Sequence, residues 1–175
     1  MRCDRINIVA YDPQWPLAFA RERDRLEAGL DKWLAAPVEH IGSTAVPGLP
    51  AKPIIDMLAL TQDRDSFQDA LPAARELGWV HAPEPADEED LEWSLCFPDI
   101  AYRSHHLHVL EHASPRWPLL LAFRDHLRRN PDLAADYGQI KLGLARHDNQ
   151  DRVRYRAGKA PFIRHVLRQI EETGG

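Results

Sequence analysis

The sequence predicts an α+β (α/β) fold in which a mixed sheet core is followed by a helical C-terminal third. Residues 1–112 alternate short β-branched or apolar runs with amphipathic helical segments, as sheets covered by helices do. In residues 113–175 the apolar side chains recur at helical spacing. The chain of 175 residues has the length of one domain and can bury a core without disulfides. We therefore expect residues 1–175 to form a single domain.

Strands are expected where short apolar or alternating runs lie between turn residues. The most apolar run, residues 54–60, is typical of a strand buried on both faces. Further strands are expected at residues 6–11, 38–41, 79–80, 91–97 and 102–110. The acidic, proline-containing residues 83–90 are expected to form a surface loop.

Helices are expected where apolar residues recur at intervals of three and four. They cover residues 15–34, a segment that ends at residue 77, and residues 117–129, 132–146 and 152–172. Either Asp63 or Asp65 is expected to cap the second helix, and Gly78 to end it. Asn130 and Pro131 separate the third helix from the fourth, because a residue before proline disfavours the helical conformation.

Composition limits the class of protein. The formal net charge of −5 argues against a general nucleic-acid binder, which would carry a basic excess. The two cysteines have no metal-type spacing, and no apolar stretch approaches the roughly 18 residues that span a bilayer. The N-terminal residues lack the apolar core of a signal peptide. We expect a cytoplasmic protein without a membrane segment, and its oligomeric state stays open.

One acidic residue, Asp56, lies inside the apolar run at residues 54–60. A buried carboxylate costs several kcal/mol unless it is paired or binds a metal. Its expected partners are His106 and His108, because residues two apart in a strand project from the same face. One carboxylate and two imidazoles form a ligand set suited to a divalent metal. The alternative is a pair of half-exposed strand histidines with ordinary hydrogen bonds.

A polar turn, Gly42-Ser43-Thr44, follows the strand expected at residues 38–41. Glycine allows a ligand to approach the backbone closely, and exposed amides with a serine hydroxyl can bind a phosphate. Basic residues near this core could neutralise the phosphate charge, namely Lys52, Arg124 and Lys141. Gly-Ser also occurs in ordinary turns, and most basic residues are solvated surface groups.

Several motifs are similar to those of the GrpB family, a set of small bacterial proteins. The most specific is Glu-His-Ile-Gly-Ser-Thr-Ala-Val-Pro-Gly-Leu-Pro-Ala-Lys-Pro-Ile-Ile-Asp at residues 39–56. Tyr-Asp-Pro-Gln-Trp at residues 11–15, His-Leu-His-Val at 106–109 and Phe-Arg-Asp-His-Leu-Arg at 123–128 extend the resemblance over most of the chain.

The resemblance implies a nucleotidyltransferase-like fold. Its pattern is a Gly-Ser turn, then a strand with two acids two residues apart, then a third acid on a later strand. Gly42, Ser43 and Asp56 fit the first two elements, but the second acid is replaced by Leu58 and the later strand supplies the two histidines. The fold implies Mg²⁺ or Mn²⁺ as cofactor, whereas this softer, less charged ligand set also suits Zn²⁺ or Fe²⁺.

Two functions of different classes are compatible with these residues. The first is a metal-dependent nucleotidyltransferase-like enzyme that acts on a nucleotide or other phosphorylated small molecule, with Asp56 and Ser43 as catalytic residues. The second is a non-catalytic module that binds a nucleotide or an anion, which the missing second acid favours. Glu39 or His40 adds a metal ligand if its strand turns it toward Asp56. A weaker third candidate, a protein-interaction role, rests on the acidic residues 87–90.

Overall fold

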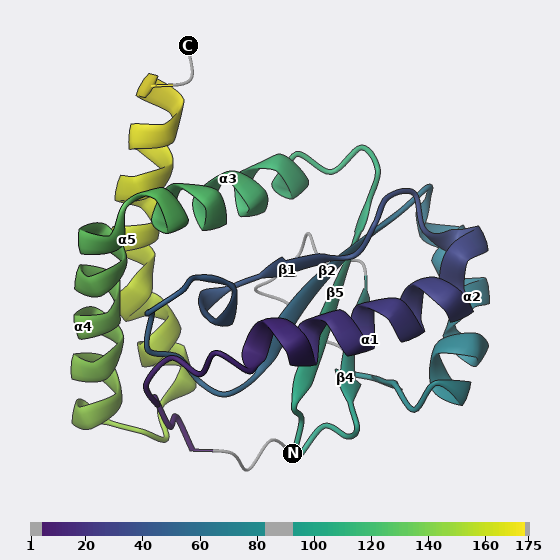
Figure 1. Cartoon of the computed structure of the whole chain (residues 1–175), viewed down its shortest axis with the longest axis horizontal. Helices are drawn as coiled ribbons and strands as arrows, with labels where there is room; N and C mark the ends of the chain where they lie inside the picture. Colours follow the sequence, from purple (N-terminus) through teal and green to yellow (C-terminus); the bar gives the residue numbers. More distant parts are fainter. Residues whose placement is uncertain (1–4, 83–92, 174–175) are drawn as a thin grey trace.

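A computed structural model describes residues 5–82 and 93–173 of the chain. The surface loop expected at residues 83–90 lies outside the described residues. Within them the chain forms one mixed sheet with helices on both faces (Figure 1). This is the α+β architecture that the sequence predicts. In the described part of the chain, no helix is long and apolar enough to cross a membrane.

The sheet has the spatial order β1-β2-β5-β4-β3. Its strands are β1 (Glu39–Ile41), β2 (Ile55–Thr61), β3 (Val80–His81), β4 (Trp93–Phe97) and β5 (His105–Glu111). Strands β2 and β5 run parallel, and the other neighbouring pairs are antiparallel. The parallel register places Asp56 directly beside His106.

The strand expected at residues 6–11 does not form. Val9 makes an isolated antiparallel bridge with Ala51, through backbone hydrogen bonds of 2.9 and 3.0 Å. The amide of Ile6 donates instead to the carbonyl of Asn149. The residues are β-branched, but a strand needs one partner along its length, and this segment contacts two separate parts of the chain.

The helices are α1 (Trp15–Leu30), α2 (Arg64–Glu76), α3 (Arg116–Arg129), α4 (Pro131–His147) and α5 (Arg152–Thr173), and four of them lie close to the expected bounds. Helix α1 ends earlier than expected, because the chain tightens into a 3₁₀ turn at Asp31–Trp33 and Leu34 is then extended. Asp63, rather than Asp65, caps α2, since its carboxylate accepts a hydrogen bond of 2.7 Å from the amide of Ser66.

The apolar side chains of β2 face two different cores. Met57 packs with Leu26 of α1 and Phe67 of α2 on one face of the sheet. Leu58 projects from the opposite face and packs with Leu120 of α3. The expected burial of this strand on both faces is confirmed.

The three C-terminal helices pack together and against the segment that follows β1. Leu127 of α3, Tyr137 of α4 and Phe162 of α5 form one cluster with Val46 and Leu49. The rings of Tyr137 and Phe162 stack with centroids 4.7 Å apart. This cluster fixes the helical third beside the Gly-Ser turn, which lies just before Val46 in the chain.

Candidate functional site

Asp56 and two histidines converge on the sheet face that α3 covers. Asp56 pairs in register with His106, and His108 projects from the same face two residues later. Oδ1 of Asp56 lies 3.6 Å from Nδ1 of His106 and 3.5 Å from Nε2 of His108. One donor atom from each residue lies within 4.8 Å of the other two. The structure therefore brings together the three residues that the sequence groups as metal ligands.

The separations from Asp56 to the two histidines match those expected between ligands of a shared metal ion. Nitrogen–oxygen distances of 3.5 and 3.6 Å exceed the usual hydrogen-bond range. Ligands about 2.1 Å from a tetrahedral ion lie about 3.4 Å from one another, close to these distances. The side chain of Asp56 is 33% exposed, which leaves the carboxylate accessible to an ion. The donor set and its spacing thus fit a divalent metal.

The second ring nitrogen of His106 is held by strand β4. Oγ of Ser94 lies 2.6 Å from Nε2 of His106, and both residues are buried. If Nδ1 held a metal, Nε2 would carry the proton and donate a hydrogen bond to Oγ of Ser94. This contact fixes the orientation of the ring and leaves Nδ1 turned toward Asp56. Metal-binding histidines in proteins are usually oriented in this way.

The protonation states of the cluster also suit a metal. Burial opposes ionisation of Asp56, but the neighbouring imidazoles outweigh burial and hold the pKa of Asp56 well below its usual value. Burial, and then the charge of neighbouring His108, lowers the pKa of His106 to about 4. An ionised carboxylate and a neutral imidazole are the forms that bind metals. At neutral pH neither residue has to lose a proton when an ion binds.

Removing the hydroxyl that orients His106 should weaken metal binding. We expect Ser94→Ala to lower the affinity for Mn²⁺ about 10- to 100-fold, the usual loss when such an outer contact is removed. The matched control is Ser104→Ala, which removes a similar 2.9 Å contact between a serine hydroxyl and Nδ1 of His105. His105 projects from the opposite face of β5. Losing the contact between Ser104 and His105 should therefore leave Mn²⁺ binding unchanged. Calorimetric titration measures both, and equal affinity for Ser94→Ala and the wild type would contradict the assigned orientation.

The Gly-Ser turn lies directly against the carboxylate of Asp56. Gly42 has a φ of 69° and a ψ of −168°, a conformation that essentially only glycine adopts. A Cβ at this position would lie 2.6 Å from Oδ2 of Asp56. Glycine therefore allows the backbone to approach the carboxylate, and Ser43 then begins a 3₁₀ turn at Ser43–Ala45.

A basic cleft surrounds Asp56, His106 and His108, the candidate metal-binding residues called the metal cluster below. One cavity, of about 140 Å³, is lined by both Asp56 and His106. It also contains the predicted phosphate-binding residues Ser43, Thr44, Lys52 and Lys141. A second cavity, of about 200 Å³, shares Asp56 and His106 and adds His108. The basic residues that line the two cavities are Lys52, Arg103, Lys141, Arg152, Arg156 and Lys159. Among the described residues Asp56 is the one carboxylate that lines them, so the cleft is electropositive in a chain of net charge −5.

Lys141 is the most deeply buried cation in this cleft. Its Nζ donates to the carbonyl of Pro50 and lies 4.8 Å from the ring centroid of Tyr137. Burial, and then the charge of Lys159, lowers the pKa of Lys141 to about 7, while Asp56 acts in the opposite direction. A bound anion would favour the charged form of this lysine.

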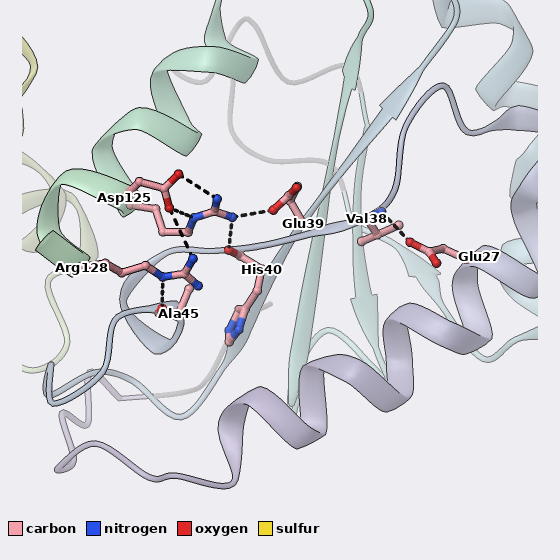
Figure 2. Close-up of polar contacts among 8 residues, drawn as sticks. Glu27, Val38, Glu39, His40, Ala45, Asp125 and Arg128 are labelled. Atoms are coloured by element: carbon pink, nitrogen blue, oxygen red, sulfur yellow. Dashed lines mark hydrogen bonds and ion pairs between the residues drawn. The ribbon is translucent and has the colours of Figure 1, made fainter. Parts of the chain in front are cut away.

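Arg124, the remaining predicted phosphate ligand, makes different contacts. Its guanidinium donates to Oε2 of Glu39 at 2.6 Å and to the carbonyl of His40 at 3.0 Å (Figure 2). Arg128, one turn along α3, donates to the carbonyl of Ala45 at 2.8 Å. These contacts tie α3 to β1 and to the 3₁₀ turn, and Arg124 lines a separate cavity bordered by α1. The structure does not bring Arg124 together with the other predicted phosphate ligands.

The two other candidate ligands on β1 are also engaged elsewhere. Glu39 projects from the same face as Asp56 but pairs with Arg124. His40 projects from the opposite face, where its ring stacks on Phe19 with centroids 4.7 Å apart. Neither Glu39 nor His40 joins the metal cluster.

A family model described as GrpB protein matches residues 5–169. The chain belongs to the GrpB family. A UPF0157 protein of Pseudomonas aeruginosa is 38% identical over 168 residues, which cover 94% of this chain and 67% of that protein. The crystal structure of the GrpB protein from Enterococcus faecalis matches with a TM-score of 0.81 at 30% identity, covering 93% of this chain and 98% of that one. The resemblance drawn from residues 39–56 is confirmed.

Some longer proteins contain a region similar to this GrpB-family chain. A dephospho-CoA kinase of Mycobacterium tuberculosis is 28% identical over 178 residues, which cover 89% of this chain and 44% of that protein. The UPF0157 protein YqkA of Bacillus subtilis is 30% identical over 161 residues, and the match covers 46% of its length. In both proteins the matched region is less than half of the whole.

Sequence reasoning missed the side chains that α5 contributes to the cleft. Arg152, Tyr155, Arg156 and Lys159 line it together, and burial raises the pKa of Tyr155 to about 12, so its hydroxyl stays protonated. The signal was present, because these residues follow one another at intervals typical of one helix face. Ser94 gives no such signal, because its contact depends on the register between β4 and β5.

Proposed function

We propose that this GrpB-family chain is a metal-dependent, nucleotidyltransferase-like enzyme whose cleft binds a nucleotide or another phosphorylated small molecule. The observation that carries the proposal is the meeting of Asp56, His106 and His108 within a cleft lined by basic side chains. A ligand whose phosphates contact those side chains would bring its phosphate oxygens next to the metal ligands.

Each part of the cleft has a chemical task in this proposal. Asp56, His106 and His108 would hold the metal, which would polarise a phosphate oxygen. Ser43 offers its hydroxyl, and Gly42 allows the turn to lie close to the cluster. Lys52 and Lys141 add positive charge, and Tyr155 adds a hydroxyl donor.

The ligand set favours one ion of the Mn²⁺, Fe²⁺ or Zn²⁺ type over a pair of Mg²⁺ ions. Two imidazoles and one carboxylate suit these softer ions, whereas Mg²⁺ prefers oxygen ligands. Asp56 is the one acid that lines the cleft in the described residues. We therefore expect one metal ion per chain.

The position of Leu58 favours a second candidate function, a non-catalytic module that binds a nucleotide or anion. Leu58 lies two residues after Asp56, where the nucleotidyltransferase pattern has its second acid, and it is fully buried in the cluster under α3. A site with a single acid can hold a metal and a phosphorylated ligand without stabilising the charge that develops during transfer.

The comparisons also support the proposed class of ligand, a phosphorylated small molecule. A relative named dephospho-CoA kinase contains a region similar to this chain. This similarity is consistent with a phosphorylated small molecule as the ligand. Because that region is 44% of the kinase, the kinase activity itself forms no part of the proposal.

Binding and transfer can be tested separately. Calorimetric titration of the full chain with ATP should show binding in the presence of Mn²⁺ and none when EDTA replaces the metal. Release of pyrophosphate from ATP, with the adenylyl group passing to water or to an added alcohol, supports the enzyme if Asp56→Asn abolishes it. Metal-dependent binding without pyrophosphate release supports the non-catalytic module, and no binding with Mn²⁺, Zn²⁺ or Mg²⁺ contradicts both.

Phosphate binding should weaken as the pH rises above about 7, the pKa of Lys141. Below that pH the lysine is charged and attracts the phosphate. Above that pH Lys141 is neutral in the free protein and must take up a proton when the phosphate binds. This proton uptake lowers the affinity up to about tenfold per pH unit. ATP titrations with Mn²⁺ between about pH 6.5 and pH 8.5 measure the effect. Lys141→Met should bind more weakly with a flatter dependence, and an unchanged wild-type affinity over this range would contradict the role of Lys141.

A further inference from the structure

An apolar cavity opens beside the metal cluster. It has a volume of about 380 Å³ and lies between α3, α5 and the sheet. Its apolar walls include Leu119, Leu120 and Phe123 of α3 and Ile163 and Leu167 of α5. Two groups of the metal cluster, Asp56 and His108, also line it. The cavity therefore has apolar walls and a polar end.

The cavity and the basic cleft meet at the metal cluster. Asp56 and His108 are the lining residues that the two share, and the cavity has one cationic lining residue, Arg116. A phosphate group would be recognised in the cleft, whereas the cavity offers contacts to an uncharged, apolar group. A phosphate group in the cleft and an apolar group in the cavity can therefore both lie next to Asp56 and His108.

The size and exposure of this cavity are those of a binding site rather than of a packing gap. A cavity of about 150 Å³ is enough to bind benzene, and small-molecule sites begin at roughly 300 Å³. Leu119 keeps 38% of its surface exposed, so the cavity is open to a ligand from solution.

We infer that this cavity is a second binding subsite, which holds the aromatic or aliphatic body of a small molecule whose hydroxyl or amine end reaches Asp56 and His108. Binding of the apolar body does not require the metal. The role of that molecule as acceptor rests on the proposed function: its hydroxyl oxygen or amine nitrogen would form a bond to the α-phosphorus of a nucleoside triphosphate, the bond to pyrophosphate would break, and the acceptor's proton would pass to water.

Tryptophol, an indole that carries a hydroxyethyl group, is a suitable probe. Ligand-observed NMR titration of the full chain in EDTA should show saturable binding at one site. Leu119→Trp places a large ring on the cavity wall at a partly exposed position and should raise the Kd at least tenfold. The matched control is Val153→Trp on α5, which is 76% exposed and does not line the cavity, and its Kd should equal that of the wild type.

Adding Mn²⁺ tests the orientation of the probe. Relaxation of the hydroxyethyl protons should exceed that of the ring protons, because the polar end lies nearer to the cluster. No binding by the wild type, unchanged binding by Leu119→Trp, or stronger relaxation of the ring protons would overturn the inference. If circular dichroism shows that Leu119→Trp does not fold, Leu119→Lys tests the same wall with a charge.

The two proposals can fail independently. Tryptophol binding in EDTA by a chain that does not bind Mn²⁺ or ATP supports the subsite and removes the proposed function. Metal-dependent ATP binding by a chain that does not bind tryptophol supports the proposed function and overturns the subsite.

Discussion

The variant Asp56→Asn is expected to bind Mn²⁺ at least about 100-fold more weakly than the wild type. This loss of affinity exceeds the usual loss when a hydrogen bond that orients a metal ligand is removed. Asparagine keeps the size of the side chain but removes the negative charge. The cluster is then left with two imidazoles and no negatively charged ligand, so it should hold a divalent ion less well. Calorimetric titration with Mn²⁺ measures the loss, and metal-dependent ATP binding should disappear with it.

The control for Asp56→Asn is Glu39→Gln, on the same face of the neighbouring strand. Glu39 pairs with Arg124 at 2.6 Å and takes no part in the metal cluster. Its loss removes one charge nearby and should leave Mn²⁺ affinity unchanged. Similar losses in both variants would show that Mn²⁺ responds to the general charge of this face rather than to a defined site.

Gly42→Ala should disrupt the site through the backbone. The added Cβ would lie 2.6 Å from Oδ2 and 3.0 Å from Cβ of Asp56, so the carboxylate or the turn has to move. The positive φ of 69° adds a conformational cost of about 1–3 kcal/mol for a residue other than glycine. We expect the free energy of unfolding to fall by at least about 2 kcal/mol and Mn²⁺ affinity to fall about tenfold or more. Chemical denaturation and calorimetry measure the two effects.

Gly48→Ala separates backbone strain from the displacement of Asp56. Gly48 also has a positive φ, of 77°, but a Cβ there would have no heavy atom within 4 Å. Its substitution should lower stability by about 1–2 kcal/mol and leave the affinity for Mn²⁺ unaltered. Equal Mn²⁺ affinities for Gly42→Ala and Gly48→Ala would contradict the role of the glycine backbone at the site.

The grouping of Asp56 with His106 and His108 could be predicted, because it is signalled by patterns within single strands. A single carboxylate in an apolar run signals a buried group that needs a partner. The period of two in a strand places His106 and His108 on one face whatever the rest of the fold. Helices α3, α4 and α5 were predictable for the same reason, since their apolar spacing is contained within each segment.

Features that depend on pairing between distant segments could not be predicted. The alignment of β4 with β5 brings Ser94 to His106, and no local pattern signals that contact. Arg124 carries the charge of a phosphate ligand, but its position on α3 directs it to Glu39. The segment at residues 6–11 has strand composition and lacks a continuous partner.

The protonation of the two imidazoles in the presence of Zn²⁺ tests the proposed metal centre most directly. His106 should bind the ion through Nδ1 and carry its proton on Nε2, which donates to Ser94. His108 should bind through Nε2 and carry its proton on Nδ1. Long-range proton–nitrogen NMR spectra of the isotope-labelled chain distinguish these tautomers. The expected result is a different tautomer for each histidine, with both sets of signals appearing together at one equivalent of Zn²⁺. Asp56→Asn should not show this response to Zn²⁺. Imidazole signals that do not respond to Zn²⁺, or the same tautomer for both histidines, would contradict the proposed centre.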